Sequence, residues 1–120
     1  MDLNLFFVRI RNFAELDEPG SPELANIVLP MPLAEALRHI QDAVKSMPLW
    51  SVESADLQAG TIHLVRRTKV FRFADDIKLR LEPVEGGTRL HGRSQSRLGM
   101  TDLGQNRRNL RELIARLGLR

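Results

Sequence analysis

Two consecutive segments, residues 75–83 (DDIKLRLEP) and 87–97 (GTRLHGRSQSR), alternate between apolar or small side chains and mostly charged ones. In the first segment Ile77, Leu79 and Leu81 fall at every second position, with charged residues between them. Neighbouring side chains of a strand point to opposite faces, so the pattern predicts strands with one apolar and one charged face. The glycine-containing connection is short, which makes the two strands antiparallel neighbours. The rest of the chain must cover the apolar face of this hairpin.

The two faces of the second strand of the hairpin differ in chemistry. One face carries Thr88, Leu90, Gly92, Ser94 and Ser96, and the other carries Arg89, His91, Arg93, Gln95 and Arg97. Two registers are open. A tight turn on residues 86–87 sets Asp76 opposite Arg97, whereas a four-residue turn sets it opposite Gln95, one step from Arg97. Either register leaves an arginine-rich face on the other side of the sheet.

Helical periodicity supplies two elements that can cover the apolar face. Pro32 suits a first helical position and Pro48 ends the helix. Between them lies an apolar stripe of Leu33, Ala36, Leu37, Ile40, Val44 and Met47. His39 lies off this stripe, and we expect it to be solvated. A last helix spans about residues 102–117, and Gly118 closes it. Its own stripe is Leu110, Leu113, Ile114 and Leu117.

Four further segments are read less directly from the sequence. Residues 49–54 and 60–73 resemble strands, and the second must bend or bulge because its alternation breaks at the arginine pair 66–67. Residues 2–13 are rich in Phe, Val, Ile and Leu and predict a first strand. Residues 14–32 contain acids, Gly and four of the six prolines, which predicts a loop with no regular element of any length.

Together these elements predict an α+β domain. We expect an antiparallel sheet of about four to five strands with two helices packed on one face, in the order β-α-β-β-β-β-α. A chain of 120 residues suits a single domain. We divide it into an N-terminal strand and loop, residues 1–31, and a core, residues 32–120.

Composition excludes several classes of site. The chain has no cysteine, which rules out disulfides, thiolate catalysis and zinc–cysteine sites. No apolar run approaches the roughly 20 residues that span a bilayer, and the first residues make a poor signal peptide. We therefore expect a soluble, cytoplasmic protein. After position 48 the chain has fourteen basic and eight acidic residues, a net charge of +6. This excess allows an anionic partner, although a solvated arginine-rich surface is the simpler explanation.

The stretch GRSQSRLGMTDLGQN, residues 92–106, joins the last strand to the last helix. Asp102 and Gln105 fit a capping box, and Gly104 suggests close packing on the first helical turn. Asn106 lies four residues before Leu110, on the apolar stripe, so its amide needs buried partners. Ser94 and Ser96 point to the same side of the sheet and can supply them. The structural interpretation is a hydrogen-bonded joint between strand and helix.

Two functional interpretations of the same region remain open. The helix N-terminus, with Arg93, Arg97, Arg107 and Arg108 near in sequence, could bind an anion, although Asp102 already occupies the positive end and no glycine-rich phosphate loop is present.

A hydrolase is the second interpretation. Asp75 and Asp76 point to opposite faces, so only Asp76 shares a face with His91 and Arg97. Ser94 and Ser96 have no identifiable base, and His63 and His91 lack metal-ligand spacing. We expect no metal site and no cofactor.

The segments FRFADDIKLRLEP and TRLHGRSQSRLGMTDLGQNRRNLRELIARL resemble the bacterial family known as domain of unknown function 1499. The resemblance covers about residues 50–117. The positions that match the family's motif are Phe73, Asp75, Asp76, Arg93, Ser94, Ser96, Arg97, Gly99, Asp102, Gly104 and Asn106. The family name implies no activity. Relatives often carry a cysteine-containing motif before the first helix, and some look exported or membrane-anchored, whereas this chain has SPELANIVLPMP there.

The sequence thus favours a noncatalytic binding or interaction domain. Its partner is an unknown protein or a small anionic or apolar ligand. One alternative is a small apolar ligand or an anion held between the sheet and the C-terminal helix. The other is a hydrolase-type enzyme that uses Asp76 and His91. Nucleic acid is not expected, because no aromatic residues are interleaved on the basic face of the last strand.

Overall fold

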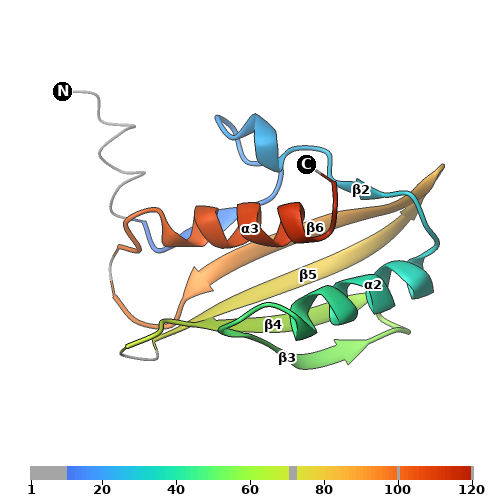
Figure 1. Ribbon diagram of the computed structural model, residues 1–120. Coiled ribbons are helices and arrows are strands. Elements are labelled where there is room, and N and C mark those ends of the chain that lie inside the picture. Colours follow the sequence, from blue (N-terminus) through green and yellow to red (C-terminus); the bar gives the residue numbers. More distant parts are fainter. Residues whose placement is uncertain (1–10, 71–72, 100, 120) are drawn as a thin grey trace.

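The structure is a computed structural model that describes residues 11–70, 73–99 and 101–119 (Figure 1). Its elements, in chain order, are β1 (Phe13–Glu15), the 3-10 helix η1 (Pro22–Leu24), β2 (Val28–Leu29), α2 (Leu33–Lys45), β3 (Trp50–Asp56), β4 (Thr61–Arg67), β5 (Ala74–Val84), β6 (Gly87–Ser96) and α3 (Gln105–Arg116). No helix within these described ranges is long and apolar enough to cross a membrane.

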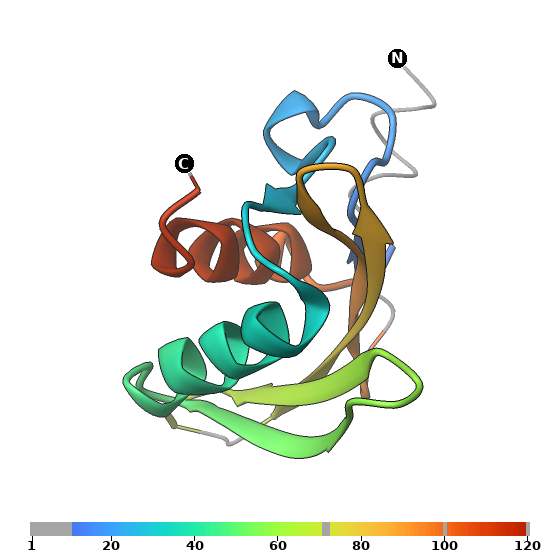
Figure 2. The ribbon, with the colours of Figure 1, turned by 90° about the vertical axis from the view of Figure 1, so that its right-hand side faces the viewer.

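Six strands form one antiparallel sheet in the order β1-β6-β5-β4-β3, and β2 also pairs with β6. Figure 2 shows that the sheet curves around α2 and α3, which both lie on the same face of the sheet. The α+β class, the antiparallel sheet and the two helices on one face are therefore confirmed. The strand count is slightly higher than predicted.

The β5–β6 hairpin adopts the second of the two predicted registers, with Asp76 opposite Gln95. Ile77, Leu79 and Leu81 are at most 3% exposed, as the alternating pattern predicts. The pairing reaches Val84 opposite Gly87, so the turn consists of residues 85–86 alone instead of the four residues predicted with this register.

The β3–β4 hairpin differs from the prediction in two ways. The strand predicted for residues 60–73 ends at Arg67. The irregularity lies in β3, between Val52 and Ser54, instead of at the arginine pair 66–67. The physical reason is position in the sheet: β4 pairs on both sides and stays in register with β5, while β3 is an edge strand whose bulge breaks only one ladder.

The N-terminal region contains more structure than the sequence predicts. The strand predicted for residues 2–13 lies outside the described residues except for its end, where Phe13 begins β1. The predicted loop, residues 14–32, includes the rest of β1, η1 and β2. Both short strands pair with β6 and so supply partners for its free edge. Pairings of two or three residues have no periodicity, which is why the sequence pattern missed them.

Helices α2 and α3 bury their predicted stripes against the sheet. Ile40 and Val44 of α2 and Leu110, Leu113 and Ile114 of α3 are at most 3% exposed. The two ends of α2 shift slightly from the prediction, since Pro32 is the N-cap and the helix ends at Lys45.

His39, expected to be solvated, is half-buried. Its Nε2 lies 3.0 Å from the carbonyl oxygen of Leu117, within hydrogen-bond distance of the C-terminal end of α3. It therefore links the two helices.

Replacing Gly87 by alanine should destabilise the fold, because the new Cβ would lie 2.1 Å from the carbonyl oxygen of Leu29 and push β2 off the edge of β6. We expect a loss of about 1–3 kcal/mol in the free energy of unfolding, the usual range for overpacking. Urea denaturation measures it. The neighbouring Gly86→Ala is the control: its Cβ meets nothing within 4 Å, so only its positive φ of 84° opposes alanine. A Gly87→Ala loss no larger than that of Gly86→Ala would contradict the packing argument.

Candidate functional site

The family-motif residues divide between the two faces of the sheet, because Asp75 and Asp76 are consecutive residues of β5. Asp75 lies on the helix-covered face and is 6% exposed. Asp76 lies on the outer face, as do Arg93 and Arg97 of the β6 side. The motif residues therefore lie on both faces of the sheet instead of around one point.

On the inner face, Asn106 is fully buried and joins α3 to β6, as predicted. The Oγ of Ser94 donates to Asn106 Oδ1 at 2.6 Å, and Asn106 Nδ2 donates to Ser96 Oγ at 2.9 Å. The same Nδ2 also donates to the carbonyl oxygen of Asn12, 2.8 Å away, just before β1. One asparagine thus holds the last helix, the last strand and the N-terminal strand together.

The network extends to Asn109, a residue that the sequence pattern did not single out. Asn109 is also fully buried, and its Nδ2 donates to Asp75 Oδ2 at 2.8 Å and to Ser94 Oγ at 3.2 Å. Gln105 Nε2 donates to Asn109 Oδ1 at 2.7 Å. A signal for Asn109 was present: it follows Asn106 by three residues and precedes Leu113 by four, so it lies on the same helical stripe.

Asp102 partly fulfils the predicted capping box. Its Oδ1 accepts from the N–H of Gly104 at 2.8 Å, and its Oδ2 accepts from the N–H of Asn106 at 3.2 Å and from the Asn106 side chain. The part of the capping box predicted for Gln105 is wrong, because the Gln105 side chain bonds to Asn109 instead of to the backbone before the helix. The helix begins at Gln105, and Gly104 is its N-cap with a φ of 82°. That backbone conformation, more than close packing, explains the glycine.

Beside this network lies a cleft of about 350 Å³, here named the motif cleft, between the β4–β5 and β6–α3 connections and the start of α3. Its polar lining consists of Thr68, Asp75, Ser96, Thr101, Asp102 and Gln105, and its apolar lining includes Phe73 and Leu98. Seven of these eight lie in the two segments that carry the family motif, and all eight are spread over 38 positions of the sequence, from Thr68 to Gln105.

Asp75 is the least satisfied acid of the motif cleft. Its Oδ2 accepts from Asn109, whereas its Oδ1 accepts no hydrogen bond from any residue in the described part of the chain. Arg66 lies directly opposite on β4, yet no salt bridge joins the two side chains. A carboxylate oxygen at this nearly buried position is open to a donor from outside the chain.

The outer face holds a second cluster. The guanidinium of Arg97 donates two hydrogen bonds of 2.9 Å to Asp76, and His63 Nε2 lies 2.6 Å from the same carboxylate. The hydrogen bonds from Arg97, followed by that from His63, lower the pKa of Asp76 from 3.8 to about 2. His91, which the hydrolase hypothesis paired with Asp76, contacts Glu82 at 3.1 Å instead. The pairing of His91 with Asp76 in that hypothesis is therefore wrong. The register of β4 with β5 places His63 beside Asp76 instead.

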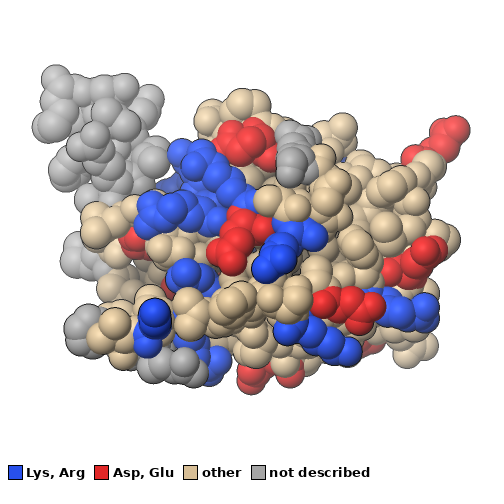
Figure 3. Space-filling model, in the orientation of Figure 1, with Lys and Arg blue, Asp and Glu red and all other residues tan. Residues whose placement is uncertain are grey.

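The arginines of the predicted anion site do not converge. Arg97 pairs with Asp76, and Arg93 donates to Glu15 at 3.1 Å while its guanidinium stacks on the ring of Phe13. The other two, Arg107 and Arg108, lie on α3. Figure 3 shows basic side chains over the first half of α3 with acidic ones among them. Within the described ranges, no three His, Asp or Glu side chains form a group that could hold a metal ion.

Removal of the Asn106 amide should destabilise the protein. Asn106→Leu leaves the hydroxyls of Ser94 and Ser96 and an oxygen of Asp102 short of partners, at a cost of about 1–3 kcal/mol. Denaturant midpoints of variant and wild type measure the loss. Gln95→Leu is the matched control, since this amide is exposed on the outer face of β6. Equal midpoints for Asn106→Leu and wild type would show that the network does not support the fold.

The Asp76 cluster predicts a pH dependence of stability. Between its folded pKa of about 2 and its ordinary value of 3.8, the unfolded state binds more protons than the folded state. Stability from this group is therefore present above about pH 4 and lost as the pH falls towards 2. Asp76→Asn should cost about 2 kcal/mol at neutral pH, and the difference from wild type should shrink below pH 4. A difference that is independent of pH, measured by urea unfolding, would refute this.

Of three comparisons with known proteins, the one with family models agrees with the motif that the sequence carries. Searches among curated proteins and solved structures found no match. A family model described as protein of unknown function (DUF1499) matches residues 11–117. The match begins well before residue 50 and so includes β1, η1, β2 and α2. The chain belongs to the DUF1499 family.

Proposed function

We propose that this chain is a noncatalytic binding module and that the motif cleft is its ligand site. One observation carries the proposal: Asp75 is 6% exposed, lines the cleft, and has a carboxylate oxygen with no donor in the described part of the chain. Nearly buried carboxylates are normally paired or fully hydrogen-bonded. A ligand that donates a hydrogen bond to Asp75 would complete this arrangement.

The polar network supports the proposal because it fixes the carboxylate in place. Asn109 holds Asp75, and Gln105 and Ser94 hold Asn109 in turn. A site whose polar group is already oriented loses little conformational entropy when the ligand arrives. The network therefore serves as the support of the site as well as the joint between strand and helix.

The chemistry of the lining indicates a ligand class. The acids favour an ammonium, guanidinium or amide N–H group. Phe73, which is 53% exposed, and Leu98, which is 71% exposed, offer apolar contact at the rim. A volume of about 350 Å³ lies at the small end of the range for ligand pockets. We infer a small amine with an apolar body, or a basic or amide-bearing side chain of a peptide.

Binding is favoured over catalysis by the partners of the candidate nucleophiles. Ser94 donates to an asparagine and accepts from another, so no base activates it. Asp75 is held by an amide, which neither takes nor gives a proton at neutral pH. The space between sheet and helices is filled by the core, so an apolar ligand buried there is not favoured.

An NMR titration with 2-phenylethylamine tests the proposal. This probe carries an ammonium for Asp75 and a ring for Phe73 and Leu98. We expect saturable shifts at the backbone amides of Asp75, Ser96 and Gln105, and their loss in Asp75→Asn. Asp76→Asn is the matched control, because it removes the adjacent carboxylate from the opposite face and should leave binding intact.

Two analogues complete the design of this titration. 2-Phenylethanol lacks the charge and should bind more weakly, and 2-phenylacetate reverses the charge and should not bind. Equal shifts from all three compounds, or unchanged binding by Asp75→Asn, would overturn the proposal. Preference for the acid would support the anion alternative instead.

A further inference from the structure

Exposed apolar side chains gather at one end of the molecule. Five large hydrophobic residues in the described ranges are exposed, and four of them lie in two connections. Val70 (78% exposed) and Phe73 (53%) belong to the β4–β5 connection, and Leu98 (71%) and Leu103 (78%) belong to the β6–α3 connection. Isolated surface hydrophobics need no explanation, but a group of four does.

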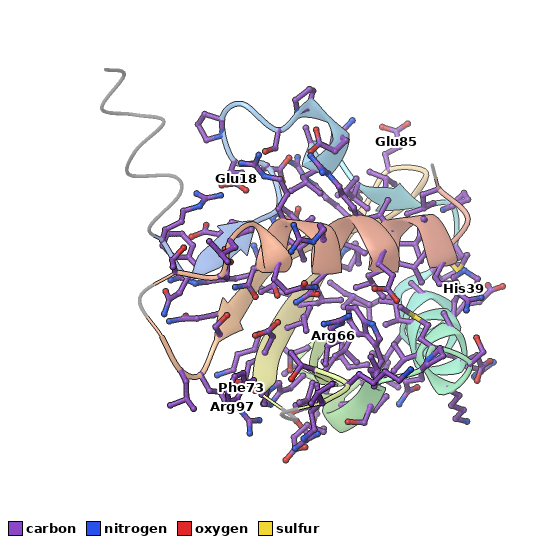
Figure 4. All side chains as sticks on the ribbon, turned by 60° about the vertical axis from the view of Figure 1, so that its left-hand side comes forward. Glu18, His39, Arg66, Phe73, Glu85 and Arg97 are labelled. Atoms are coloured by element: carbon purple, nitrogen blue, oxygen red, sulfur yellow. The ribbon has the colours of Figure 1, made fainter. Side chains whose placement is uncertain are left out.

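The two connections are neighbours in space. Phe73 and Leu98 line the same cleft, and the N–H of Arg97 donates to the carbonyl oxygen of Ala74 at 3.1 Å. Figure 1 shows both connections at the same end of the sheet, and Figure 4 shows Phe73 close to Arg97 and far from Glu85 in the β5–β6 turn. We name Val70, Phe73, Leu98 and Leu103 the apolar loop end.

Basic residues accompany the apolar loop end. Lys69 precedes Val70 and Arg97 precedes Leu98, and both are exposed. Arg108 is exposed as well, and its Nη1 donates to the carbonyl oxygen of Leu103 at 3.2 Å. Two nearby acids are engaged within the chain, since Asp76 bonds to Arg97 and Asp102 accepts bonds from the first turn of α3. The third, Asp75, is only 6% exposed. Because Asp76 neutralises Arg97, the positive charge that accompanies the apolar tips comes from Lys69 and Arg108.

Leu103 adds a conformational observation. Its φ is 51°, in the left-handed region that glycine or asparagine adopts more readily than leucine. Its side chain is 78% exposed, so core packing does not explain why a leucine occupies this position. Leu49, directly before β3, has a φ of 74°, so the backbone conformation alone does not mark a functional position, and the exposure of the Leu103 side chain carries the argument.

We propose that the apolar loop end docks on the surface of a membrane that contains anionic lipids, with its four apolar side chains in the headgroup region. The tips stand on two separate loops, which a fluid interface accommodates without shape complementarity. Interleaved cations match the negative surface potential of such a membrane. A protein partner would instead require a continuous, complementary patch. The proposal does not depend on ligand binding in the motif cleft.

Cosedimentation with vesicles tests the inference. We expect the protein to bind vesicles of phosphatidylcholine mixed with phosphatidylglycerol, to bind pure phosphatidylcholine poorly, and to dissociate as salt rises. The double variant Leu98→Asp with Leu103→Asp should bind at least about tenfold more weakly, because charged tips no longer enter the interface. Leu57→Asp is the matched control: Leu57 is 55% exposed in the β3–β4 turn, at the opposite end of β4.

A second pair of variants tests the electrostatic part. Lys69→Gln should weaken binding about fivefold, the usual effect of one cation near an anionic surface. Lys45→Gln, on α2 with its side chain 76% exposed, should have no effect.

A third variant, Val70→Ser, tests the apolar contact with a milder change and should also weaken binding to anionic vesicles. It keeps the test valid if the double variant Leu98→Asp with Leu103→Asp unfolds.

The inference is overturned by any of three results: no binding of wild type to anionic vesicles, equal binding to neutral ones, or an equal loss in Leu57→Asp. It is also overturned if Lys69→Gln weakens binding while the double variant and Val70→Ser leave it unchanged, since contact would then be electrostatic only. Because Asp75→Asn alters no exposed tip, it should bind vesicles as wild type does. Failure of the amine titration and failure of this inference are therefore distinguishable.

Discussion

The hydrogen bonds of two buried asparagines determine how the last helix sits on the sheet. The inner face is apolar along most of its length but carries Asp75, Ser94 and Ser96 at one end, and these groups cannot be buried there without partners. Asn106 and Asn109 provide them from α3. A rotation of the helix by one residue would replace an asparagine with an arginine and leave the strand groups unpaired. Apolar packing alone tolerates small rotations, whereas this polar end does not, so it specifies the orientation of α3.

The neighbouring positions Asp75 and Asp76 show how one short motif can serve both faces of a sheet. Asp75 belongs to the network beneath α3, and Asp76 belongs to a cluster with Arg97 and His63 on the outer face. A motif read as one string therefore encodes two separate arrangements. Asp75 borders the motif cleft and has a carboxylate oxygen without a donor in the described part of the chain, which is why the proposed ligand site contains Asp75 without its neighbour.

Sequence periodicity predicted the features that depend on the repeating pattern of side chains within a single strand or helix. The faces of β5 and β6, the stripe of α3 and the pairing of Asn106 with Ser94 and Ser96 all follow from periods of two or 3.6 residues. Features that depend on where separate elements meet were not predictable in the same way. The partner of Asp76 is His63 instead of His91 because the β4–β5 register decides it. The motif cleft is built by two connections, whose course no period describes. Asn109 combines the two situations. Its position on the helical stripe could be predicted from the sequence, but its hydrogen-bond partner on β5, Asp75, could not.

The pairing of β1 and β2 with β6 has a consequence for self-association. A strand with an unpaired edge can add a strand from another molecule, and sheets grow in this way into aggregates. On one side that route is obstructed, because a single N-terminal segment contributes both strands and further bonds from Leu16 and Ile27 to β6. Among the described residues the other edge is β3, which has a bulge at Glu53 and ends in Asp56. Extension of the sheet into a second copy is therefore opposed at one edge by the chain's own backbone and at the other by irregular geometry and charge.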